Sequence, residues 1–122
     1  DNFSLLNIDS FDYVIDACGD LNLKMLLIKN ADKYKLISSM GTANKMDMTR
    51  FKITTIDKTS YDPLAKIIRK KIKEEKIRTK FKVVSSDEKV MKNGAKLGTI
   101  AYMPAVSGLL CASYVINDII NK

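Results

Sequence analysis

One short segment near the start of the chain limits the fold more than any other. Residues 13–15 are apolar without alternation, Asp16 ends the run, and small residues up to Gly19 precede a helical pattern. An uninterrupted apolar run is typical of a parallel strand covered on both faces. The carboxyl end of such a strand is where open α/β sheets bind ligands. The segment therefore predicts an α/β fold with a ligand site just beyond Asp16.

The residues that follow predict a strand–helix–strand unit. Residues 20–33 show apolar side chains at the i, i+3, i+4 spacing of a helix, with Asp20 as its N-cap, and residues 36–39 predict a second strand. The two strands of such a unit are parallel. The loop after the second strand then lies at the same edge of the sheet as Gly19. Three polar residues of this loop are expected either to line a pocket or to form an ordinary turn: Thr42, Asn44 and Lys45.

The rest of the chain predicts further elements of a single domain that spans residues 1–122. We expect a short helical turn at 2–6, strands at 51–56, 81–84 and 99–103, a mobile polar loop at 85–96, and helices from Asp62–Pro63 onward and over 104–120. The helix after Pro63 has an apolar stripe of Leu64, Ile67, Ile68 and Ile72. The last helix is apolar over more than half its circumference, which predicts burial on several sides, by the sheet or by a second subunit.

The absence of certain residues and motifs argues against several kinds of catalytic, metal and membrane-spanning sites. It contains no His, which excludes His-based triads and the common zinc sites. No apolar run approaches the ~20 residues of a membrane-spanning helix, and Cys18 and Cys111 lie far apart in apolar surroundings, as expected of core residues in a cytoplasmic protein. No Gly-rich phosphate turn or P-loop occurs, so we expect that this chain alone cannot cradle a triphosphate.

Positive charge is in excess, with 21 Lys and Arg against 14 Asp and Glu. Such an excess favours a polyanionic partner such as RNA, although it is equally typical of a solvated surface. Many of the basic residues fall on the helix that follows Pro63: Lys66, Arg69, Lys70, Lys71 and Lys73. This face either contacts RNA phosphates or is a solvated face, which Glu74 and Glu75 interrupt.

Four runs, taken in order, resemble a known family. They are residues 12–18 (DYVIDAC), 37–47 (ISSMGTANKMD), 57–70 (DKTSYDPLAKIIRK) and 98–108 (GTIAYMPAVSG). Together they resemble the ThiF/MoeB/HesA family of ATP-dependent adenylating enzymes, which are related to ubiquitin-activating enzymes. The third run is most similar to the branch that acts as tRNA threonylcarbamoyladenosine dehydratase. The match covers essentially all of this chain and about the second half of a typical family member.

The resemblance implies an incomplete Rossmann-like fold, a homodimer, and ATP with Mg²⁺ for adenylation of a carboxylate. In the dehydratase branch the carboxylate belongs to the modified adenosine next to the tRNA anticodon, and its activation lets it cyclise. We therefore expect part of such an enzyme, the C-terminal half of a ThiF-type domain, to be inactive by itself. The alternatives are a sulfur-carrier adenylyltransferase, whose partner is a small protein with a Gly-Gly tail, and a non-catalytic dimerisation or tRNA-binding relative.

The resemblance also implies the site residues, with one departure. The family's first strand ends Asp-Ala-x-Asp, and its second acid is associated with Mg²⁺ and the ATP phosphates, but here Gly19 takes that position and Asp20 follows it. Asp20 therefore either reaches the metal or is only an N-cap, and Asp16, the other candidate catalytic acid, either orients the site or caps nearby backbone. Candidate nucleotide-binding residues are Gly19, Asp20, Lys24 (otherwise a solvated helix lysine), Thr42 and Asn44, and candidate substrate or tRNA residues are Lys45, Asp57, Lys58, Thr59, Asp62, Lys66, Arg69 and Lys70.

Overall fold

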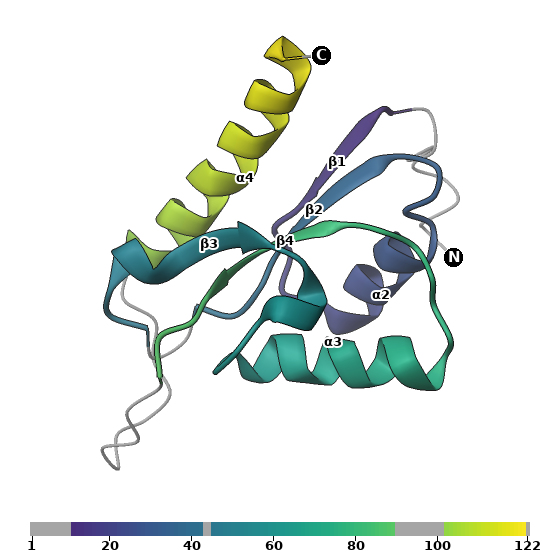
Figure 1. The fold of residues 1–122 in the computed structure, drawn as a ribbon, viewed down its shortest axis with the longest axis horizontal. Coiled ribbons are helices and arrows are strands. Elements are labelled where there is room, and N and C mark those ends of the chain that lie inside the picture. The colour runs from purple at the N-terminus through teal and green to yellow at the C-terminus, as the bar shows by residue number, and fades with distance from the viewer. Residues whose placement is uncertain (1–10, 43–44, 90–101, 122) are drawn as a thin grey trace.

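The described residues form a four-stranded mixed sheet with helices on both faces (Figure 1). The computed structural model describes residues 11–42, 45–89 and 102–121. The strands are β1 (Tyr13–Asp16), β2 (Lys35–Ser39), β3 (Phe51–Thr54) and β4 (Lys82–Ser86), in the sheet order β1-β2-β4-β3. Strands β1, β2 and β4 are parallel, whereas β3 runs antiparallel to β4. The predicted α/β class and the parallel strand–helix–strand unit are confirmed.

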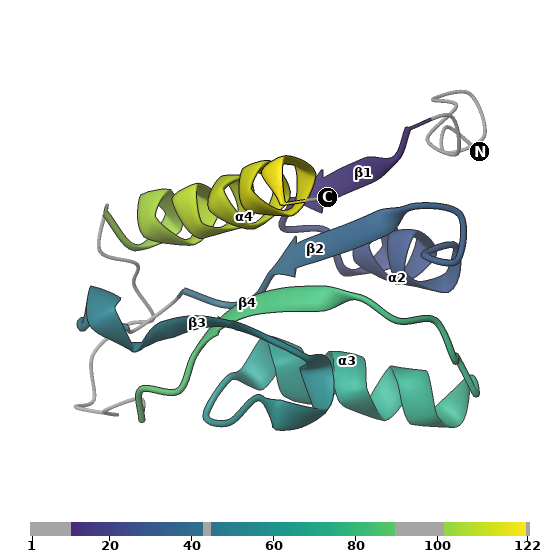
Figure 2. The same cartoon turned by 45° about the horizontal axis from the view of Figure 1, so that its top comes forward.

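In the described part of the chain, three α-helices cover the sheet. They are α2 (Leu21–Lys29), α3 (Pro63–Glu74) and α4 (Tyr102–Ile120), and two short 3₁₀ helices, η2 (Met48–Arg50) and η3 (Ile56–Lys58), flank β3. Helices α2 and α3 lie on one face and α4 on the other (Figure 2). Within the described ranges, no helix is both long and apolar enough to cross a membrane.

Each face of the sheet has its own apolar core, because successive side chains of a strand point to opposite faces. Leu36 and Val83 pack with Ile28 and Ile68 beneath α2 and α3. Their chain neighbours Ile37 and Val84 pack with Phe51 and Cys111 beneath α4. The central strands β2 and β4 are therefore buried on both sides, which explains why each has two adjacent apolar residues, Leu36–Ile37 and Val83–Val84.

Both predicted helix caps are present. The Asp20 carboxylate accepts hydrogen bonds from the backbone N–H groups of Asn22 and Leu23, and Asp62 accepts one from the N–H of Ala65, with Pro63 in the first turn. These bonds satisfy amide groups that have no partner within the helix. The caps fix where α2 and α3 begin, at the edge of the sheet where β1 and β2 end.

Several predicted boundaries were wrong. Helix α2 ends at Lys29 instead of continuing to residue 33, because the Asn30 side chain binds the Leu26 carbonyl and the chain turns. Ser85 and Ser86 belong to β4 and are buried, so the predicted mobile loop begins later than residue 85. Tyr102 and Met103, predicted as the end of a strand, lie in the first turn of α4. The predictions for residues 2–6 and 99–101, and most of the loop, fall outside the described residues.

Two predicted apolar surfaces are less buried than their pattern implied. Ile67 of α3 is 46% exposed, so the buried side of that helix centres on Ala65 and Ile68. On α4, Leu109 and Ile120 are each 70% exposed. This chain alone therefore buries one side of α4, and the expected burial on several sides would need another partner.

Candidate functional site

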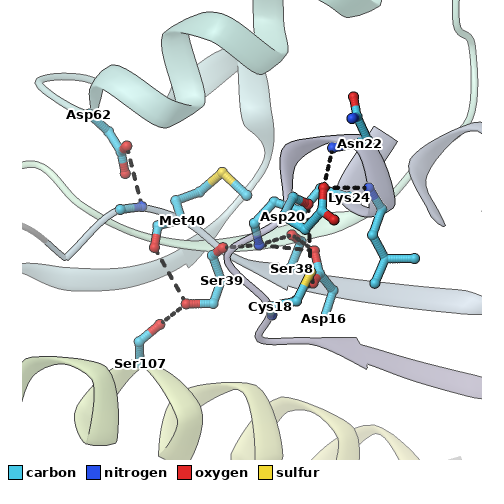
Figure 3. A network of polar contacts seen from close by, with 12 residues as sticks. Asp16, Cys18, Asp20, Asn22, Lys24, Ser38, Ser39, Met40, Asp62 and Ser107 are labelled. Carbon is cyan, nitrogen blue, oxygen red and sulfur yellow. Dashed lines mark hydrogen bonds and ion pairs between the residues drawn. The ribbon is translucent and has the colours of Figure 1, made fainter. Parts of the chain in front are cut away.

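The candidate site lies where β1 and β2 end. In the parallel register Asp16 of β1 faces Ser38 of β2, and Lys24 reaches the same point from α2 (Figure 3). The predicted strand end thus brings an acid, a base and a hydroxyl together at the edge where α/β sheets bind ligands. All three side chains are at most 2% exposed.

Asp16 is engaged on both carboxylate oxygens by neighbouring groups. Its Oδ2 accepts from Lys24 Nζ at 3.0 Å and from Ser38 Oγ at 2.6 Å, and its Oδ1 accepts from the backbone N–H of Cys18 at 3.0 Å. The Cys18 thiol also contacts Oδ1, at 2.8 Å. Asp16 is therefore placed to orient the strand end and the turn after it.

Lys24 is buried, not a solvated helix lysine. Besides Asp16 it donates to Ser38 Oγ at 3.4 Å and to the backbone carbonyl of Ser39 at 2.7 Å. Three acceptors match the three hydrogens of an ammonium group. Lys24 therefore connects α2 to the ends of both strands. Ser39 extends this network to α4, because its hydroxyl oxygen lies 2.5 Å from that of Ser107.

Gly19 and Asp20 form the exposed rim of this site. One oxygen of Asp20 serves as the helix cap, whereas Oδ2 has no partner among the described residues. A Cβ placed on Gly19 would meet nothing within 4 Å. No group of three or more acidic or Cys side chains that could hold a metal occurs within the described part of the chain. Asp20 thus presents an exposed carboxylate beside the ends of β1 and β2.

The loop after β2 is anchored to α3 and β4. The Gly41 N–H lies 3.4 Å from Asp62 Oδ1, and Ser85 Oγ donates to Asp62 Oδ2 at 2.8 Å. Asp62 is 3% exposed, so its contacts join the loop, the helix start and the strand end. Thr42 is half-buried beside Gly41, and Asn44 lies outside the described residues.

Lys45 is buried, with an exposed fraction of 1%. Its ammonium group donates to three backbone carbonyls, of Tyr61 at 2.7 Å, Ser86 at 3.3 Å and Glu88 at 2.6 Å. Burial lowers the pKa of Lys45, and the nearby carboxylates of Asp62 and Glu88 oppose that effect. These contacts give Lys45 a part in holding the loop, and they leave none of its three hydrogens for a substrate.

The segment that resembles the dehydratase branch is divided between the two ends of the sheet. Asp62 lies at the carboxyl edge, whereas Asp57 and Lys58 are exposed in a groove beside the amino ends of the parallel strands. Hydrogen bonding to Thr55 and to backbone holds the pKa of Asp57 low. Thr59 binds the guanidinium of Arg69.

The basic face of α3 is only partly as predicted. Lys66, Lys70 and Lys73 are exposed, whereas Arg69 is half-buried and bound to the Thr59 hydroxyl and carbonyl. Lys70 lies 3.9 Å from the Glu74 carboxylate, whereas Lys66 and Lys73 remain available for a polyanion. Arg69 instead fixes the loop before the helix.

Neither Cys is arranged as a nucleophile. Burial and the hydrogen bond to Asp16 raise the pKa of Cys18, and burial raises that of Cys111 to about 11. Both thiols are free, as predicted. The thiolate is the reactive form, so both environments disfavour covalent chemistry.

Sequence reasoning missed the four serines that connect the site: Ser38, Ser39, Ser85 and Ser107. The available signal was a pair of hydroxyl residues at the end of a buried apolar strand, Ser38 and Ser39 after Leu36 and Ile37. A buried hydroxyl needs a partner, and the acid at the end of the neighbouring parallel strand is the nearest one.

Comparison with known proteins gives consistent relatives, although no family model matches the chain. It is 37% identical over 129 residues to tRNA threonylcarbamoyladenosine dehydratase of Bacillus subtilis (strain 168), covering 89% of this chain and 51% of that protein. It is 37% identical over 78 residues to tRNA threonylcarbamoyladenosine dehydratase 1 of Saccharomyces cerevisiae, covering 62% of this chain and 18% of that protein.

A solved structure agrees with these relatives. The crystal structure of Escherichia coli tRNA N6-threonylcarbamoyladenosine dehydratase, TcdA, in complex with ATP matches 98% of this chain and 52% of its own, with a TM-score of 0.85 and 25% identity. The sheet and its flanking helices are therefore Rossmann-like, as expected. The chain is similar in sequence and fold to the tRNA threonylcarbamoyladenosine dehydratases, which confirms the resemblance to that branch. It spans about half the length of the Bacillus subtilis and Escherichia coli proteins and less than a fifth of the yeast protein.

Proposed function

We propose that this chain is part of an ATP-dependent dehydratase that acts on threonylcarbamoyladenosine in tRNA. The observation that carries the proposal is 37% identity to the Bacillus subtilis dehydratase over 89% of this chain. The fold of the ATP-bound Escherichia coli relative supports it. Adenylation suits a dehydration of this kind because AMP turns a poor leaving group on the carboxylate into a good one.

In this proposal the edge formed by β1 and β2 is one wall of the nucleotide site. Asp16, Lys24 and Ser38 are positioning residues, because their polar groups bind one another and fix the strand ends. Gly19 and Thr42 lie on the two loops that leave this edge and would border the nucleotide.

Asp20 is the residue that would hold Mg²⁺. Its cap uses one carboxylate oxygen, and the other is exposed without a partner among the residues described. Magnesium is commonly held by one or two carboxylates together with substrate phosphates. A single exposed carboxylate at the nucleotide edge fits that chemistry, and the bound ion would supply charge neutralisation at the phosphates.

Calorimetry with Mg·ATP on the longest natural form of the protein tests this site. Asp20→Ser keeps a capping oxygen but removes the carboxylate, so we expect Mg·ATP affinity to fall roughly tenfold while the unfolding midpoint stays close to that of the wild type. Gly19→Asp, which has open space for its side chain, is expected to restore affinity in the Asp20→Ser background. No binding by the wild type, together with no rescue by Gly19→Asp, would reject the catalytic interpretation.

The substrate is tested separately. Release of pyrophosphate from ATP should depend on tRNA that carries threonylcarbamoyladenosine, and unmodified tRNA should not support it. Release that requires a small protein with a Gly-Gly tail would instead identify a sulfur-carrier adenylyltransferase. ATP-independent binding of tRNA without pyrophosphate release would identify a non-catalytic relative.

We also propose that α4 contributes to a homodimer. Its outer face presents Leu109, Ile116 and Ile120, which are 70%, 56% and 70% exposed, and its one charged residue, Asp118, binds Tyr13 and Lys35 of the sheet instead. A helix that is apolar all round is normally buried. Sedimentation equilibrium should give a dimer that Ile116→Lys converts to monomer, whereas Asn121→Lys, just beyond the helix, should leave it dimeric.

A further inference from the structure

The positive charge of this chain is concentrated in one stretch. Nine of the 21 basic residues and two of the 14 acidic residues lie between Lys66 and Lys82. The remainder of the chain is therefore neutral, and the whole net charge of +7 resides in α3, the segment after it and the first residue of β4. A solvated surface needs no such segregation, whereas a polyanion-binding surface does.

This stretch leads to a groove at one end of the molecule. The amino ends of β1, β2 and β4 lie together with the carboxyl ends of α2 and α3 (Figure 2). A groove of about 930 Å³ opens there, and Lys33, Lys35, Lys58, Lys80 and Lys82 line it from three separate segments. It lies at the opposite end of the parallel strands from Asp16 and Asp20.

The lysines of the groove are not equally available. Lys35 is bound to Asp118 at 3.0 Å and lies over the Tyr13 ring. Neither Lys80 nor Lys82 forms an ion pair within the described part of the chain, and Lys58 has only the electrostatic influence of neighbouring Asp57. Three positive charges therefore remain for a ligand: one on η3, one just before β4 and one on the first residue of β4.

The groove also contains groups that a simple phosphate site would avoid. Asp12, Asp32 and Asp57 line it beside Tyr13 and Tyr114. Carboxylates accept hydrogen bonds from ribose hydroxyls, and aromatic rings stack with unpaired bases. Both tyrosines are half-buried, and Lys35 lies over the Tyr13 ring, so Tyr114 is the ring that a base would meet first. This combination of lysines with acceptors and rings suits RNA better than DNA or a bare polyphosphate.

We infer that this groove binds a segment of RNA, with Lys58, Lys80 and Lys82 on its phosphates and the exposed lysines of α3 extending the contact. The inference rests on the proposed function in taking that RNA to be the tRNA substrate. The groove and the nucleotide edge lie at opposite ends of the sheet. The groove would therefore bind a part of the tRNA that is distant from the reacting adenosine.

Binding of a fluorescein-labelled tRNA transcript to the longest natural form tests the groove, by anisotropy at 50 and 200 mM KCl. Lys80→Glu is the groove variant, and Lys89→Glu is its matched control, an exposed lysine outside the groove that gives the same change in charge. We expect Lys80→Glu to weaken binding roughly tenfold and to lower the salt slope by about one, because phosphate contacts release counterions. Lys89→Glu should stay within about twofold of the wild type.

Two further measurements separate the possible failures. A DNA of the same sequence should bind more weakly than the RNA, and equal binding would overturn the assignment to RNA. Equal losses of tRNA affinity in Lys80→Glu and Lys89→Glu, or no loss in either, would contradict RNA binding in the groove. Mg·ATP calorimetry on Lys80→Glu should match the wild type. An absent Mg·ATP signal with the RNA effect intact rejects the proposed nucleotide site and leaves the groove supported.

Discussion

Two lysines, Lys24 and Lys45, lie at the same edge of the sheet with equal burial, yet their ammonium groups are held in different ways. Each is 1% exposed. Lys24 has a carboxylate partner, Asp16, at 3.0 Å together with Ser38 and a backbone carbonyl. Lys45 has three backbone carbonyls and, among the residues that the structure describes, no carboxylate in contact.

This difference shows two ways to bury a cation. An ion pair makes each partner dependent on the other, because removing one leaves an uncompensated charge in a region of low dielectric. Carbonyl dipoles hold a cation without such a partner, and burial accordingly lowers the pKa of Lys45. We therefore expect the network around Lys24 to be the more sensitive to a single substitution, and the contacts of Lys45 to matter chiefly for the loop they join.

Asp16→Asn should have the largest effect. The substitution keeps the shape of the side chain but leaves the Lys24 charge unpaired, so we expect the free energy of unfolding in urea to fall by about 3–5 kcal/mol. The double variant Asp16→Asn/Lys24→Met removes both charges and should be more stable than the single variant. A loss below about 1 kcal/mol for Asp16→Asn would contradict the ion-pair description.

Lys45→Met should cost less, about 1–3 kcal/mol, because it leaves carbonyl groups without a donor but no unpaired charge. The pH dependence follows from the lowered pKa of Lys45. At alkaline pH the unfolded chain binds more protons at this position than the folded one. The difference in stability between the wild type and Lys45→Met should therefore increase in favour of the wild type as pH rises toward 10.5. A difference that stays constant between pH 8 and 10 would argue against a lowered pKa.

The sequence predicted the βαβ unit and both helix caps because these depend on local patterns. The apolar run before Asp16, the capping residues Asp20 and Asp62, and Pro63 each act within a few positions of the chain. The interpretation of Asp62 as a cap was correct, but its bond to Ser85, 23 residues away, depends on how β4 packs beside the loop. No local pattern contains that information.

The burial of Lys24 and Lys45 likewise could not be predicted from local sequence. Lysine is almost never fully buried unless it is paired. The sequence therefore predicted Lys24 as either nucleotide-binding or solvated, and Lys45 as either pocket-lining or part of an ordinary turn. Burial of Lys24 follows from its place on the inner face of α2 opposite an acid at the end of β1. Burial of Lys45 requires backbone carbonyls from two distant segments, at Tyr61 and at the end of β4, to converge, which only the assembled fold shows.

An exposed ion pair gives a smaller effect than either buried lysine. Arg50 and Lys52 bind Asp87 at 2.6 and 2.9 Å and lower its pKa to about 2. Exposed pairs contribute about 0.2–1 kcal/mol, so Asp87→Asn should cost no more than that at pH 7. Because a lowered acid pKa stabilises the fold above the unfolded pKa, the difference from the wild type should vanish as pH falls from about 4 to 2. Urea unfolding at pH 7, 4 and 2 measures it, and a difference that persists at pH 2 would contradict the assignment.

The smallest expected effect on function is that of replacing Cys18. Its thiol contacts the Asp16 oxygen that does not bind Lys24, so the reactivity of the thiol reports on the charge of Asp16. The thiol lies 2.8 Å from Asp16 Oδ1, and burial together with this contact raises its pKa. Alkylation by iodoacetamide should therefore be slow at pH 8 and accelerate only above pH 9, while Cys111, fully buried with a pKa of about 11, should label more slowly still. Cys18→Ala should change Mg·ATP affinity less than about twofold, since no step of the proposed reaction uses the thiol. Rapid labelling of Cys18 at pH 7 would show that its thiolate forms readily, which a charged Asp16 in contact with the sulfur does not allow.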